Sequence, residues 1–242
     1  MKTPVQVAEE KYLLGELEKI KAVLVTREHE VELQRCAADP WYWFQKYVYT
    51  VDEKDPYAPV KKYPDWSILE DYCTLWKAYP EVRQIALEKS RRVLATLSFV
   101  GLFLWDSMFL DGRLNIITSQ NEEKANIQIE RRAWVMYEHL PEWMQEAIPA
   151  KKIFGKLHVF GSRDLRKKVP SLIWSVPQEN EQARGETGSN YLFDEVVAQT
   201  EAEKNYMAAM PAVELGVKIG ARIILISTAG TGFFDRLVHD TI

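Results

Sequence analysis

Cysteine is scarce in this sequence, and its scarcity excludes a fold built on disulfide bonds. The 242 residues contain two cysteines, Cys36 and Cys73, which are too far apart to form a CxxC pair. Disulfide frameworks and cysteine zinc sites need more cysteines at closer spacing. The four histidines occur singly, so their spacing does not indicate a zinc site either. With no secretory leader recognisable, the chain is expected in a reducing intracellular compartment.

Long apolar runs and an excess of positive charge are also missing. The longest uncharged stretch, residues 93–105, has 13 residues, whereas a membrane-spanning helix needs about 20. We therefore expect a buried core helix there and no membrane partner. The formal net charge of −4 argues against a surface that binds nucleic acid without specificity. Any DNA contact must come from a local basic site.

The composition is otherwise that of a globular protein, with 47% hydrophobic and 27% charged residues. An apolar stripe at helical spacing within residues 1–50 predicts a helical lead-in that docks on the core. A connector with several prolines follows, so we place the core domain at residues 51–242. The aromatic cluster between Trp41 and Tyr49 is interpreted as packing at a hydrophobic corner, with a base-stacking platform as the alternative.

Short apolar runs alternate with longer helical patterns through the core domain. Helices are expected at residues 66–79, 96–110 and 121–139, and residues 152–163 are typical of a β-hairpin. This alternation predicts an α/β fold with a mostly parallel sheet and helices on both of its faces. The expected strands are residues 82–87, 114–118, 172–176, 191–193 and 221–226.

A basic turn follows the first expected strand and leads into a helix that begins with a hydroxyl residue. Free N–H groups at a helix N-terminus and nearby cations can hold phosphate groups, and the Thr96 hydroxyl can then bind Mg²⁺. The standard GxxxxGK[ST] pattern is incomplete, because Leu94 and Ala95 occupy the positions of its glycine and lysine. Taken alone, such a turn is more often a solvated loop. The candidate phosphate-binding residues are Lys89, Ser90, Arg91, Arg92, Val93, Leu94, Ala95 and Thr96.

Two acids end another expected strand. Asp194 and Glu195 follow the apolar residues 191–193. ATP hydrolysis requires such a pair, because one carboxylate orders the Mg²⁺ shell and the other polarises the attacking water. An alternative role for these acids is to cap the next helix. Residues 227–230 begin with two hydroxyl residues at the end of a neighbouring strand, and α/β sheets bind ligands at that edge.

These three motifs, in this order, resemble the ATPase half of the large terminase subunits of tailed bacteriophages. The resemblance runs from about Asp39 to the end of the chain and implies a P-loop NTPase core that binds ATP and Mg²⁺. In that family the essential cation of the phosphate loop often lies at the start of the loop. The resemblance therefore makes Lys89, Arg91 and Arg92 the candidates for contacting phosphate, without a choice among the three.

The resemblance also implies roles for the other two motifs. Asp194 matches the Walker B acid, which binds Mg²⁺ together with Thr96. Glu195 matches the catalytic carboxylate. The coupling motif of the family, which links hydrolysis to motion, is matched by Ser227, Thr228 and Ala229.

Two further contacts are implied by the same resemblance. Family members usually carry an aromatic residue or proline beside a glutamine upstream of the loop, where adenine is contacted. Here Tyr63 and Trp66 occupy that place without the glutamine, which implies a ring contact only. Arg184 lies 11 residues before Glu195, where terminases place an arginine that can reach a neighbouring subunit's γ-phosphate. An ordinary loop arginine is the alternative.

As a whole, the resemblance implies a motor that couples ATP hydrolysis to translocation of double-stranded DNA into a viral procapsid. The implied partners are DNA, the portal protein and the small terminase subunit, with monomers assembling into a homo-oligomeric ring in the host cell cytoplasm. Basic residues within 163–168 are candidates for contacting DNA phosphates, although they are equally typical of a solvated loop. Only residues 230–242 follow the coupling motif, so no nuclease domain and no DNA cleavage are expected.

Two other functions stay open. A helicase-like, DNA-stimulated ATPase shares the same acids and a similar sheet, but a helicase needs a second motor domain to close on the nucleotide. The incomplete phosphate loop also suits an assembly scaffold that binds nucleotide with little turnover. Measured turnover of Mg-ATP separates the motor from the scaffold.

Overall fold

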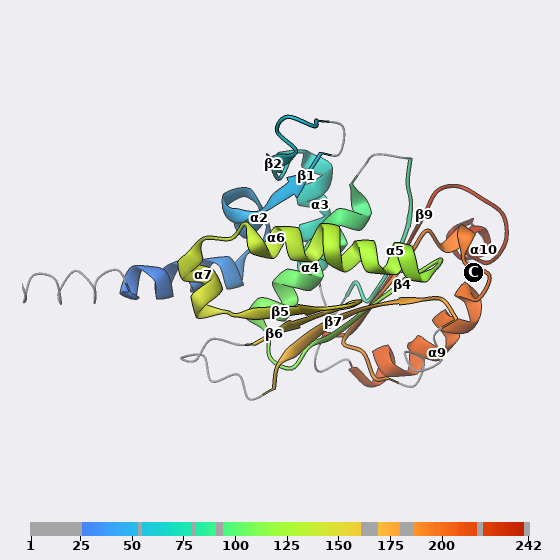
Figure 1. Ribbon diagram of the computed structural model, residues 1–242. Coiled ribbons are helices and arrows are strands. Elements are labelled where there is room, and N and C mark those ends of the chain that lie inside the picture. The colour runs from blue at the N-terminus through green and yellow to red at the C-terminus, as the bar shows by residue number, and fades with distance from the viewer. Residues whose placement is uncertain are drawn as a thin grey trace, which may run out of the picture. The chain divides into compact units, whose positions relative to one another are not determined.

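The computed structural model describes residues 26–52, 55–78, 81–90, 94–160, 169–179, 186–216 and 220–239. Its contacts separate two compact units, residues 1–39 and residues 40–242. In the first unit, the described part is helical from residue 26 to residue 38. The second unit contains the sheets and the remaining described helices (Figure 1).

A seven-stranded sheet lies at the centre of the second unit. Five neighbouring strands run parallel, in the order β3 (Gln84–Glu88), β9 (Arg222–Ser227), β8 (Asn190–Asp194), β4 (Leu114–Ser119) and β7 (Ser171–Pro177). Beyond β7, β6 (Lys156–Val159) and β5 (Ala150–Ile153) add an antiparallel hairpin. The expected α/β fold with a mostly parallel sheet is confirmed, and so is each of the strands predicted for it.

Helices cover both faces of this sheet. The segment expected to be helical at residues 121–139 forms α5, the π-helix η1 and α6 in succession, and these lie with α4 on one face, while α9 lies on the other (Figure 1). A separate pair of antiparallel strands, β1 (Tyr49–Val51) and β2 (Val60–Lys62), follows α2. The helices are α2 (Pro40–Tyr47), α3 (Ser67–Lys77), α4 (Ala95–Phe109), α5 (Glu122–Ile127), η1 (Gln128–Ala133), α6 (Trp134–Glu138), α7 (Glu142–Ala147), the 3₁₀ turn η2 (Val196–Ala198), α9 (Ala202–Leu215) and α10 (Phe233–His239).

The central strands are apolar because both of their faces are covered. Every residue of β8 and β9 is buried, as is usual for parallel strands. On one face, Phe193 and Leu225 belong to a cluster with residues of α9 and α10. On the other face, Asn190 Nδ2 donates a hydrogen bond of 3.1 Å to Asp106 Oδ2 of α4. Successive side chains of a strand point to opposite faces, so β8 contacts the helices on both sides of the sheet.

α4 is the buried core helix that the sequence predicts. Its residues from Ala95 to Met108 are buried, apart from Leu97. α2 approaches it closely because residue 101 is glycine, and a Cβ on Gly101 would lie 2.5 Å from Phe44 Cζ. Phe44 and Trp43 are fully buried, which confirms the packing interpretation for these two aromatic residues. Within the described residues, no helix is both long enough and apolar enough to span a bilayer.

Candidate active site

The predicted motifs meet at the edge of the sheet where the parallel strands end. β9 lies between β3 and β8. β3 is followed by Lys89, β9 ends in Ser227 and β8 ends in Asp194. The backbone N–H of Lys89 donates a hydrogen bond of 2.9 Å to the Ser227 carbonyl. The start of the predicted phosphate loop is therefore attached to the strand that ends in the predicted coupling motif, at the edge where α/β sheets bind ligands.

Lys89 contacts the second acid of the pair. Its Nζ donates a hydrogen bond of 3.1 Å to Glu195 Oε1, and the two side chains are 11% and 38% exposed, respectively. Glu195 has φ 56° and ψ 55°, in the left-handed region, which costs a residue with a side chain about 1–2 kcal/mol. Strained backbone of this kind clusters at functional sites. The turn leaves the carboxylate open both to Lys89 and to solvent.

Thr96 contacts the first acid of the pair. Its Oγ1 donates a hydrogen bond of 2.7 Å to Asp194 Oδ1, and both side chains are buried. Mg²⁺ prefers oxygen ligands and is commonly held by one or two protein side chains together with phosphate groups. A threonine hydroxyl beside a carboxylate fits that donor set. Across the described ranges, no cluster of three or more His, Cys, Asp or Glu side chains offers a different metal site.

A strained leucine stands where the phosphate-loop pattern has its glycine. Leu94 has φ 50° and ψ 15°, the left-handed conformation that glycine adopts without strain. The Leu94 carbonyl accepts hydrogen bonds of 2.9 Å from both the N–H and the hydroxyl of Ser98. The main chain therefore keeps a turn suited to glycine at the start of α4. The left-handed backbone costs leucine about 1–2 kcal/mol.

Two residues outside the predicted motifs also contact Asp194. Gln128, the first residue of η1, donates from Nε2 to Asp194 Oδ2 at 2.8 Å. Arg132 Nη1 lies 3.8 Å from the same oxygen and donates a hydrogen bond to Gln128 Oε1. Residues four apart share one face of a helix, so their mutual contact was open to prediction. The sequence contains no signal that this face meets the acid pair.

Gln199 holds the acid strand against its neighbour. Its Nε2 donates to the carbonyl oxygen of Asp194 at 2.7 Å and to that of Thr118 at 3.1 Å. Thr118 belongs to β4, which pairs with β8. Gln199 therefore ties together the ends of two strands directly beneath the acid pair, a role that its place five residues after Asp194 did not reveal.

The predicted coupling segment contacts the turn that follows Glu195. Ser227 Oγ accepts a hydrogen bond of 3.1 Å from the Val197 N–H. A Cβ on Gly230 would lie 2.5 Å from Val197 Cγ1, so this glycine lets the two segments approach. Ser227 is buried, Thr228 is half-buried and Ala229 is exposed. A movement of residues 227–230 would therefore displace the turn that follows Glu195, the candidate catalytic residue.

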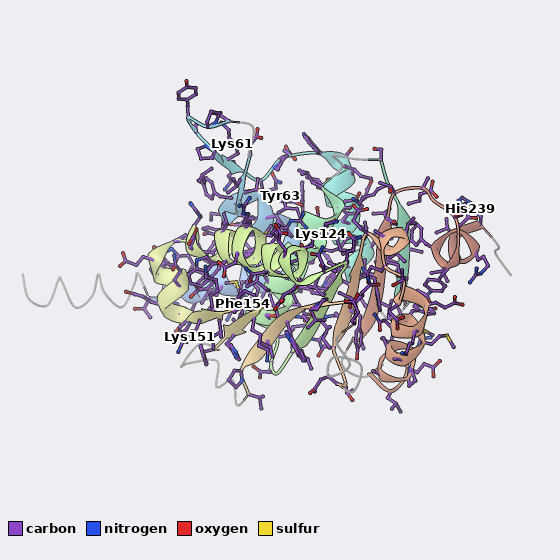
Figure 2. All side chains as sticks on the ribbon, turned by 45° about the vertical axis from the view of Figure 1, so that its right-hand side comes forward. Lys61, Tyr63, Lys124, Lys151, Phe154 and His239 are labelled. Atoms are coloured by element: carbon purple, nitrogen blue, oxygen red, sulfur yellow. The ribbon has the colours of Figure 1, made fainter. Side chains whose placement is uncertain are left out.

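The structure does not support the ring contact expected from Tyr63. Tyr63 is only 2% exposed, its ring centroid lies 4.5 Å from that of Phe44, and its hydroxyl shares a hydrogen bond of 2.7 Å with Ser98 Oγ. Burial raises the pKa of its hydroxyl. Tyr63 follows β2 and lies closer to the helices than Lys61 does (Figure 2). Trp66, which is 48% exposed, stays available for such a contact.

Several predicted residues lie outside the described part of the chain. They are Arg91, Arg92, Val93, Arg184 and the basic residues at 163–168. Of the other residues predicted for the phosphate loop, Ser90 is exposed and Ala95 is buried.

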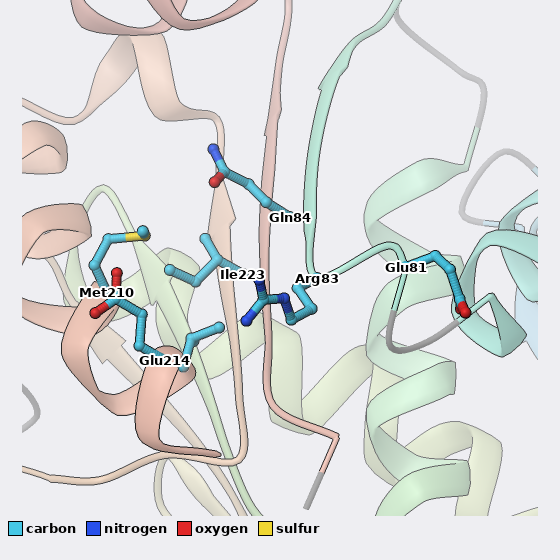
Figure 3. A pocket seen from close by; sticks show the side chains of 7 residues that line it. Glu81, Arg83, Gln84, Met210, Glu214 and Ile223 are labelled. Carbon is cyan, nitrogen blue, oxygen red and sulfur yellow. The ribbon is translucent and has the colours of Figure 1, made fainter. Parts of the chain in front are cut away.

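A separate pocket of about 290 Å³ lies at the opposite end of β3, between Arg83 and Gln84 on one side and Met210 and Glu214 of α9 on the other (Figure 3). It is therefore remote from the acid pair.

Solved structures of phage packaging proteins share this fold. The ATPase domain of the Thermus phage P74-26 large terminase is 14% identical, with a TM-score of 0.51, over 63% of this chain and 62% of that one. The bacteriophage HK97 large terminase is 14% identical, with a TM-score of 0.56, over 77% of this chain and 36% of that one. This chain therefore spans less than two thirds of the length of either protein. No family model and no curated protein matches the sequence. The likeness is one of fold, and it confirms the resemblance drawn from the motifs: this chain has the fold of a phage large terminase ATPase domain.

Proposed function

We propose that this chain is the ATP-hydrolysing motor domain of a viral DNA-packaging large terminase. One observation carries the proposal: both ends of the predicted phosphate loop contact the acid pair. Lys89 contacts Glu195 at the start of the loop, and Thr96 contacts Asp194 at its end. Phosphates held by residues 89–96 would therefore lie beside both carboxylates, as hydrolysis requires.

Each residue of the site has a distinct role in this proposal. Lys89, with Arg91 or Arg92, neutralises the phosphates of ATP. Thr96 and Asp194 would hold Mg²⁺, which would supply positive charge to neutralise the phosphate oxygens. Glu195 accepts a proton from the attacking water. When Lys89 turns to the phosphate, Glu195 loses its ion-pair partner and becomes available to water.

The partners of the proposed motor follow from the proteins that share the fold. Those proteins are phage large terminases, so we infer that this chain also moves double-stranded DNA into a procapsid, with a portal protein and a small terminase subunit, in the host cytoplasm. Monomers would assemble into a ring in which Arg184 reaches the neighbouring site. Ser227, Thr228 and Ala229 would carry the effect of hydrolysis away from Glu195, and Trp66 would contact the adenine ring.

Turnover and binding of Mg-ATP, measured on the purified chain with and without double-stranded DNA, test the proposal. We expect Mg²⁺-dependent phosphate release, and we expect Asp194→Ala to lose the Mg²⁺-dependent part of ATP affinity. Asp111→Ala, an exposed acid in the turn between the end of α4 and the start of β4, at the opposite end of α4 from Thr96, is the matched control. Binding without turnover under any condition would favour the assembly scaffold, and no binding at all would contradict both functions.

A further inference from the structure

The contact between η1 and the acid pair has no role in the function proposed so far. Asp194 Oδ1 accepts from Thr96, whereas Oδ2 accepts from Gln128 Nε2 at 2.8 Å. Arg132 donates to Gln128 Oε1, and its Nη1 lies 3.8 Å from Asp194 Oδ2. Gln128 is 2% exposed, and the Arg132 side chain is 29% exposed. A buried amide therefore links a partly buried guanidinium to a carboxylate.

The element that presents these residues is itself unusual. η1 is a π-helix of six residues between two α-helical segments. π-helical turns are rare, and many of them lie at functional sites. Here the π-helical turn begins with the residue that contacts Asp194, so the irregular backbone and the contact coincide.

We propose that Arg132, acting through Gln128, is a positioning residue that competes with the divalent cation for the Asp194 carboxylate. The guanidinium offsets the charge of this carboxylate in the absence of metal. A nearby positive charge disfavours the approach of another cation, and the effect is stronger in a partly buried site than in water. Arg132 would therefore oppose binding of Mg²⁺ at Asp194, and its contact with Asp194 through Gln128 would weaken when the cation is held there. This inference rests on the proposed function, because it assumes that Asp194 is a metal ligand.

The competition predicts that removal of Arg132 strengthens binding of the cation. Arg132→Gln should lower the Mg²⁺ concentration that half-saturates binding of a fluorescent ATP analogue, by about threefold or more, since removing the positive charge leaves the carboxylate free to attract the cation. A residue with only a structural role would have the opposite effect, because its loss would loosen the site. Arg132→Lys keeps the charge and should restore much of the wild-type Mg²⁺ requirement.

Arg131→Gln is the matched control. It removes the same charge from the same π-helical segment, but Arg131 is exposed, so its variant should keep the wild-type Mg²⁺ requirement. Thermal unfolding of each variant shows whether the fold is retained.

A titration with Mn²⁺ in the absence of nucleotide, followed by electron paramagnetic resonance, separates the two proposals. Arg132→Gln should bind Mn²⁺ more tightly than wild type. If the wild-type chain binds neither Mg-nucleotide nor Mn²⁺, the proposed function fails and this inference fails with it. If the wild type binds both, and Arg132→Gln shows an unchanged or higher cation requirement, the inference alone is overturned.

Discussion

The Lys89 ammonium and the Glu195 carboxylate form a hydrogen-bonded ion pair of 3.1 Å at the end of the sheet. The pair occupies both groups that the proposed reaction needs, because Lys89 must contact phosphate and Glu195 must contact water. ATP binding therefore has to break it. The triphosphate is a suitable competitor, since charged phosphate oxygens form strong hydrogen bonds with an ammonium group.

Glu195→Gln should abolish turnover and leave ATP binding largely intact. The amide cannot accept a proton from water. Loss of the ion pair with Lys89 removes a competitor of phosphate, so the phosphate contacts proposed for residues 89–96 should not be weakened. Phosphate release and titration with a fluorescent ATP analogue measure the two effects separately. Glu203→Gln, an exposed acid on α9, should change neither. Near-normal hydrolysis by Glu195→Gln would remove this residue from its role.

Alanine substitutions of the three candidate phosphate cations should have unequal effects. A loop without the usual lysine must neutralise phosphate charge from another position, so loss of the essential cation should weaken binding or turnover by more than tenfold, about 1.4 kcal/mol. Lys89→Ala is expected to be that variant, because its ammonium already lies at the acid pair. Arg91→Ala or Arg92→Ala should be milder. Three mild effects, no larger than that of the exposed Lys124→Ala control, would mean that the loop does not hold phosphate.

Leu94 allows the strain of the phosphate loop to be measured. Leu94→Ala and Leu94→Gly both remove the side chain, but only glycine relieves the left-handed backbone. We expect Leu94→Gly to have the larger free energy of unfolding in urea, by about 1 kcal/mol. At Leu97, inside α4, the same pair should show the usual helical order, with alanine more stable than glycine by about 1 kcal/mol. The same order at both positions would mean that Leu94 carries no strain.

Arg184→Ala should leave the monomer's ATP affinity unchanged and remove the stimulation of turnover that assembly produces. An arginine that acts across a subunit boundary contributes nothing to its own pocket, so the isolated domain should bind ATP and hydrolyse it slowly. The loss on assembly can reach about 10³-fold if Arg184 behaves like other arginine fingers. Turnover measured against protein concentration checks both statements.

Mixed assemblies decide whether Arg184 acts in trans. A ring that contains Arg184→Ala and Glu195→Gln subunits can pair an intact arginine with the intact carboxylate of a neighbour, so partial recovery of turnover is expected. The absence of recovery, together with a monomer already impaired by Arg184→Ala, would place the arginine in its own subunit's site or in the fold.

The sequence alone predicted the five parallel strands, the hairpin that follows α7, and the helices α3, α4 and α5 to α6. It did not predict α2, β1, β2, α7, α9 or α10. β8 is an example of a predicted element: an apolar run followed by two acids predicts a buried strand that ends in charge, and residues 190–194 form it. α4 is another, because an uncharged run too short to span a bilayer predicts a buried helix. These features depend on side-chain periodicity over a few neighbouring residues. The spacing of hydrophobic residues along the chain is therefore enough to predict these elements without knowledge of any long-range contact.

Only the tertiary structure decided which side chains meet. Glu195 is held by Lys89, which lies 106 positions away, and Asp194 is held by Gln128, which lies 66 positions away. Tyr63 resembles a ligand-contacting ring in the sequence, but it is buried against α2 and α4. Periodicity defines the faces and ends of each element. The strand order and the path of the helices over the sheet determine which of those ends become neighbours, and contacts between positions so far apart leave no trace in the local pattern.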